Sequence, residues 1–278
     1  MAKLTAIQLT SVPDVEQNLA TIDRLMSQLP YDEHHLVVLP ECCLYFGGKD
    51  AEQLTLARDT YQEETSELIL ALAELAKKHR VFLVAGTLPY YRPQADKFSN
   101  RCCVFSPEGE LIEYYDKIHL FDVVVEDNEK NYLESKYTQA GEAVKQVNLP
   151  FTQLGLTVCY DLRFPELYRA LAAHGANVIT VPAAFTKVTG QAHWQALLQA
   201  RAIENQCYII AADQEGTHAN GRETYGHSMI ISPWGEILAC QQSGHGTITV
   251  DYDAGQIEKI RKTMPVHRHN KFTTELVK

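Results

Sequence analysis

The sequence predicts an α/β protein whose elements form a four-layer α-β-β-α sandwich. Strand and helix patterns alternate along the chain, and the pattern restarts after a long polar segment at 123–143. Each half reads as β-α-β-α followed by consecutive strands. A sheet that carries helices on one face has to bury its other face, so two such halves would stack sheet against sheet. A doubly wound single sheet remains the alternative, because periodicity alone does not separate the two arrangements.

The first half begins with alternating apolar residues at 4–10, which are typical of a half-buried strand. Apolar residues then recur at helical spacing over 13–29, with Asp14 near the start, where it can cap a helix. A turn at 107–110 joins the last two strands of this half. The remaining predicted elements are a short buried strand, a helix in two pieces and three strands, at 35–40, 52–79, 81–88, 101–107 and 110–116.

The second half repeats the order of elements. A strand at 152–160 precedes a helix at 165–174, whose first residue, Pro165, suits the first helical turn. The other predicted elements are a strand at 176–182, a helix at 192–206 and strands at 207–213, 226–232, 236–240 and 246–252.

Composition and charge are those of an ordinary globular protein. The chain has 278 residues, of which 45% are hydrophobic and 22% charged, which suits one domain spanning 1–278. The net charge of −10 disfavours nucleic acid or an anionic membrane surface as the main partner. No apolar run approaches the ~18 residues of a membrane span, and the first residues lack the apolar core of a signal peptide. We therefore expect a cytoplasmic protein.

The cysteine and histidine patterns predict no disulfide framework and no metal site. The seven cysteines include the adjacent pairs Cys42–Cys43 and Cys102–Cys103 and form no C-x-x-C motif. Reduced thiols are the simplest account, with one member of each adjacent pair in the core and the other near the surface. The eleven histidines form no H-E-x-x-H motif, and no dinucleotide or phosphate-binding loop is present. We expect chemistry that needs no metal and no cofactor.

Three reactive side chains stand where predicted strands end. Glu41 follows the strand at 35–40, Lys117 follows the strand at 110–116, and Cys159 ends an apolar run. In open α/β folds, catalytic groups gather beyond the carboxyl ends of strands. A thiolate can attack a carbonyl, a carboxylate can take the thiol proton, and an ammonium can hold a developing oxyanion. Each residue alone also has a structural interpretation. Cys159 can be a buried small residue, Glu41 can belong to a turn or cap, and Lys117 can pair with Asp116 or Asp122.

Five sequence blocks resemble those of the nitrilase superfamily of carbon–nitrogen hydrolases. LPECCLYFGG, YDKIHLFD and VCYDLRFPELYR match the three signature blocks of the family in order and spacing. FTKVTGQAHWQALLQARAIENQCY and GRETYGHSMIISPWGEILA are similar to the branch that hydrolyses deaminated glutathione, a near relative of the ω-amidases. The resemblance covers nearly the whole chain. It implies the α-β-β-α sandwich and subunits that pair through a helical face into homodimers or larger assemblies.

The resemblance also implies a catalytic triad formed by Glu41, Lys117 and Cys159. A second catalytic glutamate of the family lies in the loop before the cysteine, and NYLESKYTQAGE matches that block at Glu134. The implied role of this glutamate is to orient the lysine or to help position the substrate. The nearby alternatives for it are Glu142 and Glu129.

Substrate recognition is predicted at residues that follow the strand ends. Deaminated glutathione carries carboxylates and a 2-oxo group, and the planar fork of an arginine can bind both oxygens of a carboxylate. Arg163, four residues past the cysteine, is the first choice, and a salt bridge to Asp161 or Glu166 is the competing interpretation. The other predicted substrate-binding residues are Tyr160, through its backbone N–H, and Tyr45, Phe185 and Thr186.

The predicted function is therefore hydrolysis of the amide bond of deaminated glutathione. The products would be 2-oxoglutarate and cysteinylglycine, released through a thioester on Cys159. The alternative within this class is an ω-amidase that acts on 2-oxoglutaramate or another small-carboxylate amide. A non-catalytic binding protein is disfavoured because the chain keeps all three triad residue types. A redox protein is disfavoured because no resolving cysteine lies at a motif spacing.

Overall fold

A computed structural model describes residues 2–63, 65–125 and 131–276. Within these residues the chain forms a seven-stranded sheet, a six-stranded sheet and three two-stranded pairs. The strands of the first sheet are β1 (Lys3–Gln8), β2 (His35–Val38), β5 (Phe82–Val84), β6 (Leu88–Arg92), β7 (Lys97–Phe105), β8 (Leu111–Asp116) and β19 (Gly246–Asp251). The strands of the second sheet are β11 (Gln146–Leu149), β12 (Thr152–Leu156), β13 (Val178–Ala183), β14 (Tyr208–Asp213), β17 (Ser228–Ile231) and β18 (Ile237–Gln241).

Helices and short strand pairs complete the described structure. The α-helices are α1 (Val15–Met26), α2 (Asp50–Asp59), α3 (Glu67–His79), α4 (Pro165–Ala173), α5 (Lys187–Asn205), α6 (Ala254–Thr263) and α7 (Val266–His269). Two 3₁₀ turns are η1 (Glu134–Lys136) and η2 (Cys159–Arg163). The short pairs are β3 (Tyr61–Gln62) with β4 (Thr65–Ser66), β9 (Asp122–Val124) with β10 (Asn131–Leu133), and β15 (Glu215–Thr217) with β16 (Glu223–Tyr225). No helix in the described ranges is both long and apolar enough to cross a membrane.

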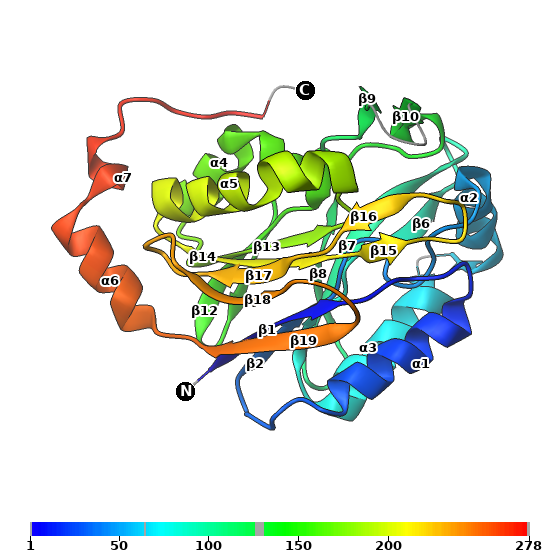
Figure 1. Cartoon of the computed structure of the whole chain (residues 1–278), viewed down its shortest axis with the longest axis horizontal. Helices are drawn as coiled ribbons and strands as arrows, with labels where there is room; N and C mark the ends of the chain where they lie inside the picture. Colours follow the sequence, from blue (N-terminus) through cyan, green and yellow to red (C-terminus); the bar gives the residue numbers. More distant parts are fainter. Residues whose placement is uncertain (1, 64, 126–130, 277–278) are drawn as a thin grey trace.

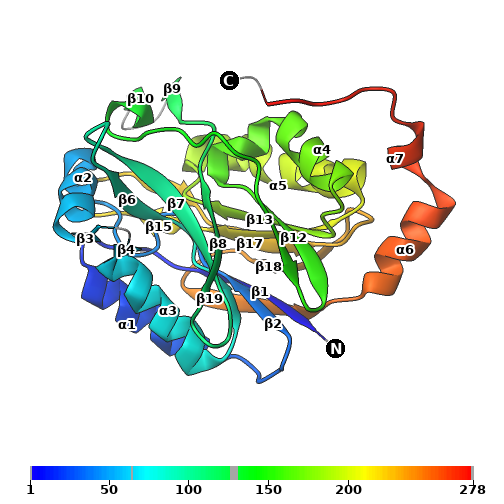
Figure 2. The same cartoon turned by 180° about the vertical axis from the view of Figure 1, so that it is seen from behind.

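The two sheets lie face to face between two layers of helices (Figures 1 and 2). Helices α1 and α3 cover the outer face of the first sheet, and α4 and α5 cover that of the second. In the first sheet the strand order is β19-β1-β2-β5-β7-β6, with β8 also paired to β7. In the second sheet it is β11-β12-β13-β14-β17-β18. The predicted four-layer α-β-β-α sandwich is thereby confirmed, and the doubly wound single sheet is excluded.

Alternation along the strands explains why these residues form these layers. In β2, Leu36 and Val38 are buried in the cluster shared with the second sheet, whereas Val37 packs into the cluster shared with α1 and α3. The same alternation corrects the prediction for one cysteine pair. Cys102 lies in the inter-sheet cluster and Cys103 in the helix-side cluster, and both are fully buried. Neither face of β7 meets solvent at this point, so neither thiol lies near the surface.

The structure also differs from the predicted elements at several boundaries. The last strand of the second half, β19, pairs antiparallel with β1 and so joins the first sheet. The predicted strand at 81–88 is interrupted at Gly86, where a Cβ would lie 1.9 Å from the carbonyl oxygen of Pro40. Helix α5 begins at Lys187 rather than at 192. The pattern analysis did not detect α6, α7, β11 or the short pairs β3–β4, β9–β10 and β15–β16.

Candidate active site

The predicted nucleophile lies in a strained turn beyond a strand. Strand β12 ends at Leu156, and Cys159 begins the 3₁₀ turn η2 instead of continuing the predicted strand. Its φ of +46° falls in the left-handed region, which costs a side chain other than glycine of order 1–2 kcal/mol. The turn is held by Asp161, whose Oδ2 accepts the backbone N–H of Val158 at 2.8 Å. Local hydrogen bonding therefore maintains a backbone conformation that an unconstrained cysteine would avoid.

The carboxylate of Asp161 also binds the segment that carries Lys117. It is fully buried and accepts the Tyr115 hydroxyl at 2.8 Å. On its other oxygen it accepts the backbone N–H of His119 at 3.2 Å and the ring Nδ1 of the same histidine at 2.6 Å. One carboxylate thus joins residues on both sides of Lys117 to the turn that begins at Cys159.

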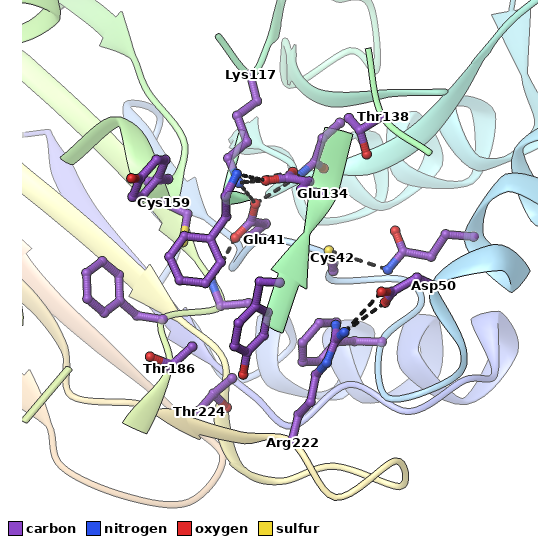
Figure 3. Close-up of a pocket in the computed structure, with 18 of the residues that line it drawn as sticks. Glu41, Cys42, Asp50, Lys117, Glu134, Thr138, Cys159, Thr186, Arg222 and Thr224 are labelled. Atoms are coloured by element: carbon purple, nitrogen blue, oxygen red, sulfur yellow. Dashed lines mark hydrogen bonds and ion pairs between the residues drawn. The ribbon is translucent and has the colours of Figure 1, made fainter. Parts of the chain in front are cut away.

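The amine of Lys117 lies between two carboxylates (Figure 3). Its Nζ donates to Glu41 Oε1 at 2.9 Å and to the two oxygens of Glu134 at 2.9 and 3.1 Å. The side chain of Lys117 is 2% exposed, that of Glu41 is 6% exposed and that of Glu134 is 18% exposed. Breaking such a buried pair by removing one partner is costly, because the remaining charge is left unpaired.

Further donors fix the orientation of the two glutamates. Asn100 Nδ2 donates to Glu41 Oε1 at 2.8 Å, and the backbone N–H of Ala184, just past β13, donates to Glu41 Oε2 at 3.0 Å. The backbone N–H of Phe121 donates to Glu134 Oε2 at 2.7 Å. Donors from within β7, from just past β13 and from just before β9 therefore hold the carboxylates in place.

Burial and charge set the protonation of the cluster. Burial opposes the positive charge of Lys117, but the carboxylates of Glu134 and Glu41 outweigh it and raise the pKa of the amine well above its ordinary value. Burial raises the pKa of Glu134, against the effect of the neighbouring ammonium. Burial, followed by the nearby Glu41 carboxylate, raises the pKa of the Cys159 thiol well above its ordinary value. At neutral pH the thiol is therefore protonated, and to act as a nucleophile it would have to give its proton to a base.

These side chains line one cavity that opens to solvent. The cavity wall contains all four predicted catalytic residues and three predicted substrate-binding residues: Glu41, Lys117, Glu134, Cys159, Tyr160, Phe185 and Thr186. Phe46, Asp50, Tyr132 and Arg222 are also among the lining residues. Within the described ranges, no three His, Cys, Asp or Glu side chains are grouped so that they could hold a metal ion.

Two predicted substrate-binding residues do not line this cavity. The Tyr45 hydroxyl donates to Glu52 Oε2 at 2.9 Å, which holds the ring against the start of α2. The guanidinium of Arg163 lies over the ring of Phe185 at 5.2 Å, with Nη1 3.4 Å from Nδ1 of His193 on α5. Phe185, and not the arginine, forms the cavity wall at this point.

The alternatives for the second glutamate have different outcomes. Glu142 is exposed and is not part of the cavity lining. Glu129 lies outside the residues that the structure describes. Glu134 therefore remains the residue that contacts Lys117 in the described part of the loop.

The sequence analysis missed Asn100, Asp161, Ala184, Asp50 and Arg222. The amide of Asn100 is contributed by β7, where it lies between Ser99 and Arg101, and the Ala184 contact uses only backbone. Neither has a local signal in the sequence. Asp161 is predicted above only as a possible partner of Arg163, and Arg222 lies within the GRETYGHSM block, where no local signal distinguishes it from a surface arginine.

The fold and the cavity define a hydrolase of the carbon–nitrogen type, and the comparison with known proteins establishes the family. The chain belongs to the carbon–nitrogen hydrolase family, whose profile matches residues 3–262. It is 40% identical over 277 residues to the deaminated glutathione amidase of Yersinia enterocolitica, covering 99% of this chain and 95% of that protein.

Two solved structures show the same fold. The NitFhit protein of Caenorhabditis elegans superposes with a TM-score of 0.88 at 35% identity, covering 98% of this chain and 66% of that fusion protein. Nit3 of Saccharomyces cerevisiae, a member of branch 10 of the nitrilase superfamily, superposes with a TM-score of 0.85 at 32% identity. That match covers 98% of this chain and 97% of the yeast chain.

Proposed function

We propose that this protein is an amidase that hydrolyses deaminated glutathione to 2-oxoglutarate and cysteinylglycine. The observation that carries the proposal is the buried Glu41–Lys117–Glu134 cluster in the same cavity as Cys159. The name of the Yersinia enterocolitica relative supports this substrate.

In the first stage, the sulfur of Cys159 attacks the amide carbonyl carbon while Glu41 takes the thiol proton. The charge that develops on the carbonyl oxygen is held by the Lys117 ammonium and by the backbone N–H of Tyr160. The carbon–nitrogen bond then breaks, and Glu41 returns its proton to the departing α-amine of cysteinylglycine. The 2-oxoglutaryl group remains as a thioester on Cys159.

In the second stage, water replaces the dipeptide. Glu41 takes a proton from the water, the hydroxyl adds to the thioester carbon, and the carbon–sulfur bond breaks. The proton returns to sulfur, so the net reaction consumes one water and yields one acid and one amine. Glu134 keeps the Lys117 amine charged and oriented through both stages.

An ω-amidase that acts on 2-oxoglutaramate is the second candidate. That substrate is also a 2-oxo acid amide, but it lacks the dipeptide. The deciding experiment compares kcat/KM for deaminated glutathione and 2-oxoglutaramate with the purified protein. A clear preference for deaminated glutathione is expected, and a preference for 2-oxoglutaramate would replace the proposed substrate.

We also propose a cytoplasmic location and a homodimer or larger assembly. All seven cysteines are free thiols, which fits a reducing compartment. Sedimentation of the purified protein tests the assembly state.

A further inference from the structure

A buried carboxyl group lies next to the active site but outside the cavity wall. Asp213 is the last residue of β14, pairs in register with Ala183 of β13, and is fully buried. Its Oδ1 accepts the backbone N–H of Phe185 at 2.8 Å. Its Oδ2 is buried as well and has no hydrogen-bond partner among the described residues. Because Asp213 is not a lining residue, it can act on a substrate only through other groups.

The segment just past β13 connects this carboxyl group to the reactive side chains. Ala184, which precedes Phe185, donates its backbone N–H to Glu41 Oε2 at 3.0 Å. Burial raises the pKa of the Cys159 thiol, and the same Ala184 N–H opposes that rise. The hydrogen bond from Phe185 to Asp213 is therefore one residue away from a donor that acts on both Glu41 and Cys159.

The surroundings of Asp213 favour its neutral form. Away from water, an ionised carboxylate with an unpartnered oxygen costs far more than the neutral acid. Burial raises the pKa of Asp213 well above its ordinary value, and the Glu41 carboxylate adds to this effect. Backbone N–H groups oppose the rise, but those of Gln214 and Gly226 already donate to backbone carbonyls. A negative charge on Asp213 would further raise the pKa of the Cys159 thiol, which burial already raises.

We propose that Asp213 is a positioning residue that works as a neutral acid. By holding the Phe185 N–H, it keeps the neighbouring Ala184 N–H in place. That N–H then stays on Glu41 and beside the sulfur of Cys159, and no negative charge is added to the site. The proposal rests on the proposed amidase reaction for its consequence, since it concerns the base and the nucleophile of that reaction.

The first test measures the thiol and needs no substrate. Wild type, Asp213→Asn and Asp213→Leu react with iodoacetamide between about pH 7 and pH 9, and mass spectrometry follows the Cys159 peptide. Asp213→Asn keeps an acceptor for the Phe185 N–H and should react within about 2-fold of wild type. Asp213→Leu lacks the acceptor, so less thiolate should form at a given pH and the rate should fall about 10-fold. Glu41 and Lys117, the other ionisable groups that act on this sulfur, are the same in every variant.

Steady-state kinetics give the second measurement. With deaminated glutathione, kcat of Asp213→Leu should fall about 10-fold, whereas Asp213→Asn should stay within about 3-fold of wild type. Thr152→Val is the control for a purely structural loss. Thr152 begins β12, is buried, bonds to the Tyr252 hydroxyl at 3.0 Å and does not line the cavity. This control should lower the thermal unfolding midpoint and leave alkylation and kcat unchanged.

Separate results would overturn the two parts of the proposal. Faster alkylation of Asp213→Asn would show that a negative charge had been lost, and alkylation as slow as in Asp213→Leu would show that the acceptor does not matter. Wild-type alkylation and kcat in Asp213→Leu would remove the positioning role.

If Asp213→Leu does not fold, infrared spectra of wild type and Asp213→Asn at about pH 7 decide the question. We expect a protonated carboxyl band that is present in wild type and lost in the variant, and loss of a carboxylate band instead would overturn the proposal. A wild-type protein that hydrolyses neither deaminated glutathione nor 2-oxoglutaramate would refute the amidase function. The alkylation rates would still decide the role of Asp213 in that case.

Discussion

The inner and outer ends of the cavity are held in different ways. At the inner end, Lys117 and Glu41 are almost fully buried, Glu134 is 18% exposed, and Glu41 receives donors from within β7 and from just past β13. At the outer end, Arg222 lies on a hairpin with a half-exposed partner. Burial strengthens charge interactions and makes any unpaired charge expensive, so the inner end has one stable arrangement. The outer end can change its residues at low cost in stability.

This difference bears on the proposed reaction. In that reaction, the buried inner end supplies the groups that would act on any linear amide. Substitutions at the inner end should therefore affect all amide substrates equally.

The largest effect is expected for Cys159→Ala. The variant lacks the sulfur that, in the proposed reaction, forms the thioester, so kcat should fall by about four to six orders of magnitude for both substrates. The fold should persist, because the change removes a single atom from a side chain that borders the cavity. Turnover and thermal unfolding of the purified variant measure the two outcomes.

A suitable control is Cys240→Ala, which removes an exposed thiol on β18. It should retain wild-type turnover. Substantial hydrolysis by Cys159→Ala would show that another group is the nucleophile, and the comparison between the two ends would lose its basis.

The next largest effect is expected for Lys117→Met, and it involves stability as well as rate. Without the ammonium, Glu41 and Glu134 would face each other as buried carboxylates, and the free energy of unfolding should fall by about 3–5 kcal/mol. Loss of the proposed oxyanion donor should lower kcat by at least about 100-fold for both substrates. Urea unfolding and steady-state kinetics measure the two effects.

An exposed pair provides the matched control. Lys78 lies 2.7 Å from Asp23 but is 61% exposed, so Lys78→Met should cost no more than about 1 kcal/mol. If Lys117→Met were as mild as this control, the buried cluster would not be the stable, fixed end of the cavity that the structure indicates.

The sequence predicted the layers of the fold because strand alternation and helical spacing are local signals. The alternation in β2 illustrates this. Leu36 and Val38 pack in the core between the two sheets, whereas Val37 packs in the core on the helix side. The pairing of β19 with β1 could not be predicted in this way. It depends on which sheet edge is free after folding, and no local pattern encodes that.

The same distinction applies to the site. Strand-end position and family motifs selected Glu41, Lys117, Glu134 and Cys159, and the structure brings these residues into one cavity. Arg163 was selected by closeness in sequence to the cysteine, but the 3₁₀ turn directs its guanidinium onto Phe185 and towards α5. Arg222 is far along the chain and reaches the cavity only through the hairpin. Spacing along the sequence does not show which distant residues the fold brings to the cavity.

The smallest expected effect tests whether the outer end responds to mild acid. His218 starts the hairpin loop that Arg222 ends, and its backbone N–H donates to the Arg222 carbonyl at 2.8 Å. Its ring Nδ1 lies 3.1 Å from the Ser11 carbonyl and its Nε2 lies 2.8 Å from the Thr224 hydroxyl. Burial, with a smaller contribution from the Arg222 charge, lowers the pKa of His218 from 6.5 to about 4.

The sign of the pH effect follows from this lowered pKa. Between pH 6.5 and 4 the unfolded chain binds a proton at His218 that the folded chain does not, so the stability present above pH 6.5 is lost as the pH falls. From pH 7.5 to pH 5 this group alone should lower the free energy of unfolding by about 2 kcal/mol. Urea unfolding of wild type and His218→Gln at both pH values measures the difference, because the contributions of other histidines cancel between the two proteins. Equal losses in both proteins would mean that His218 is protonated without strain in the fold. In that case, the hairpin carrying Arg222 would be no more sensitive to acid than the buried cluster around Lys117, and the two ends of the cavity would not differ in this respect.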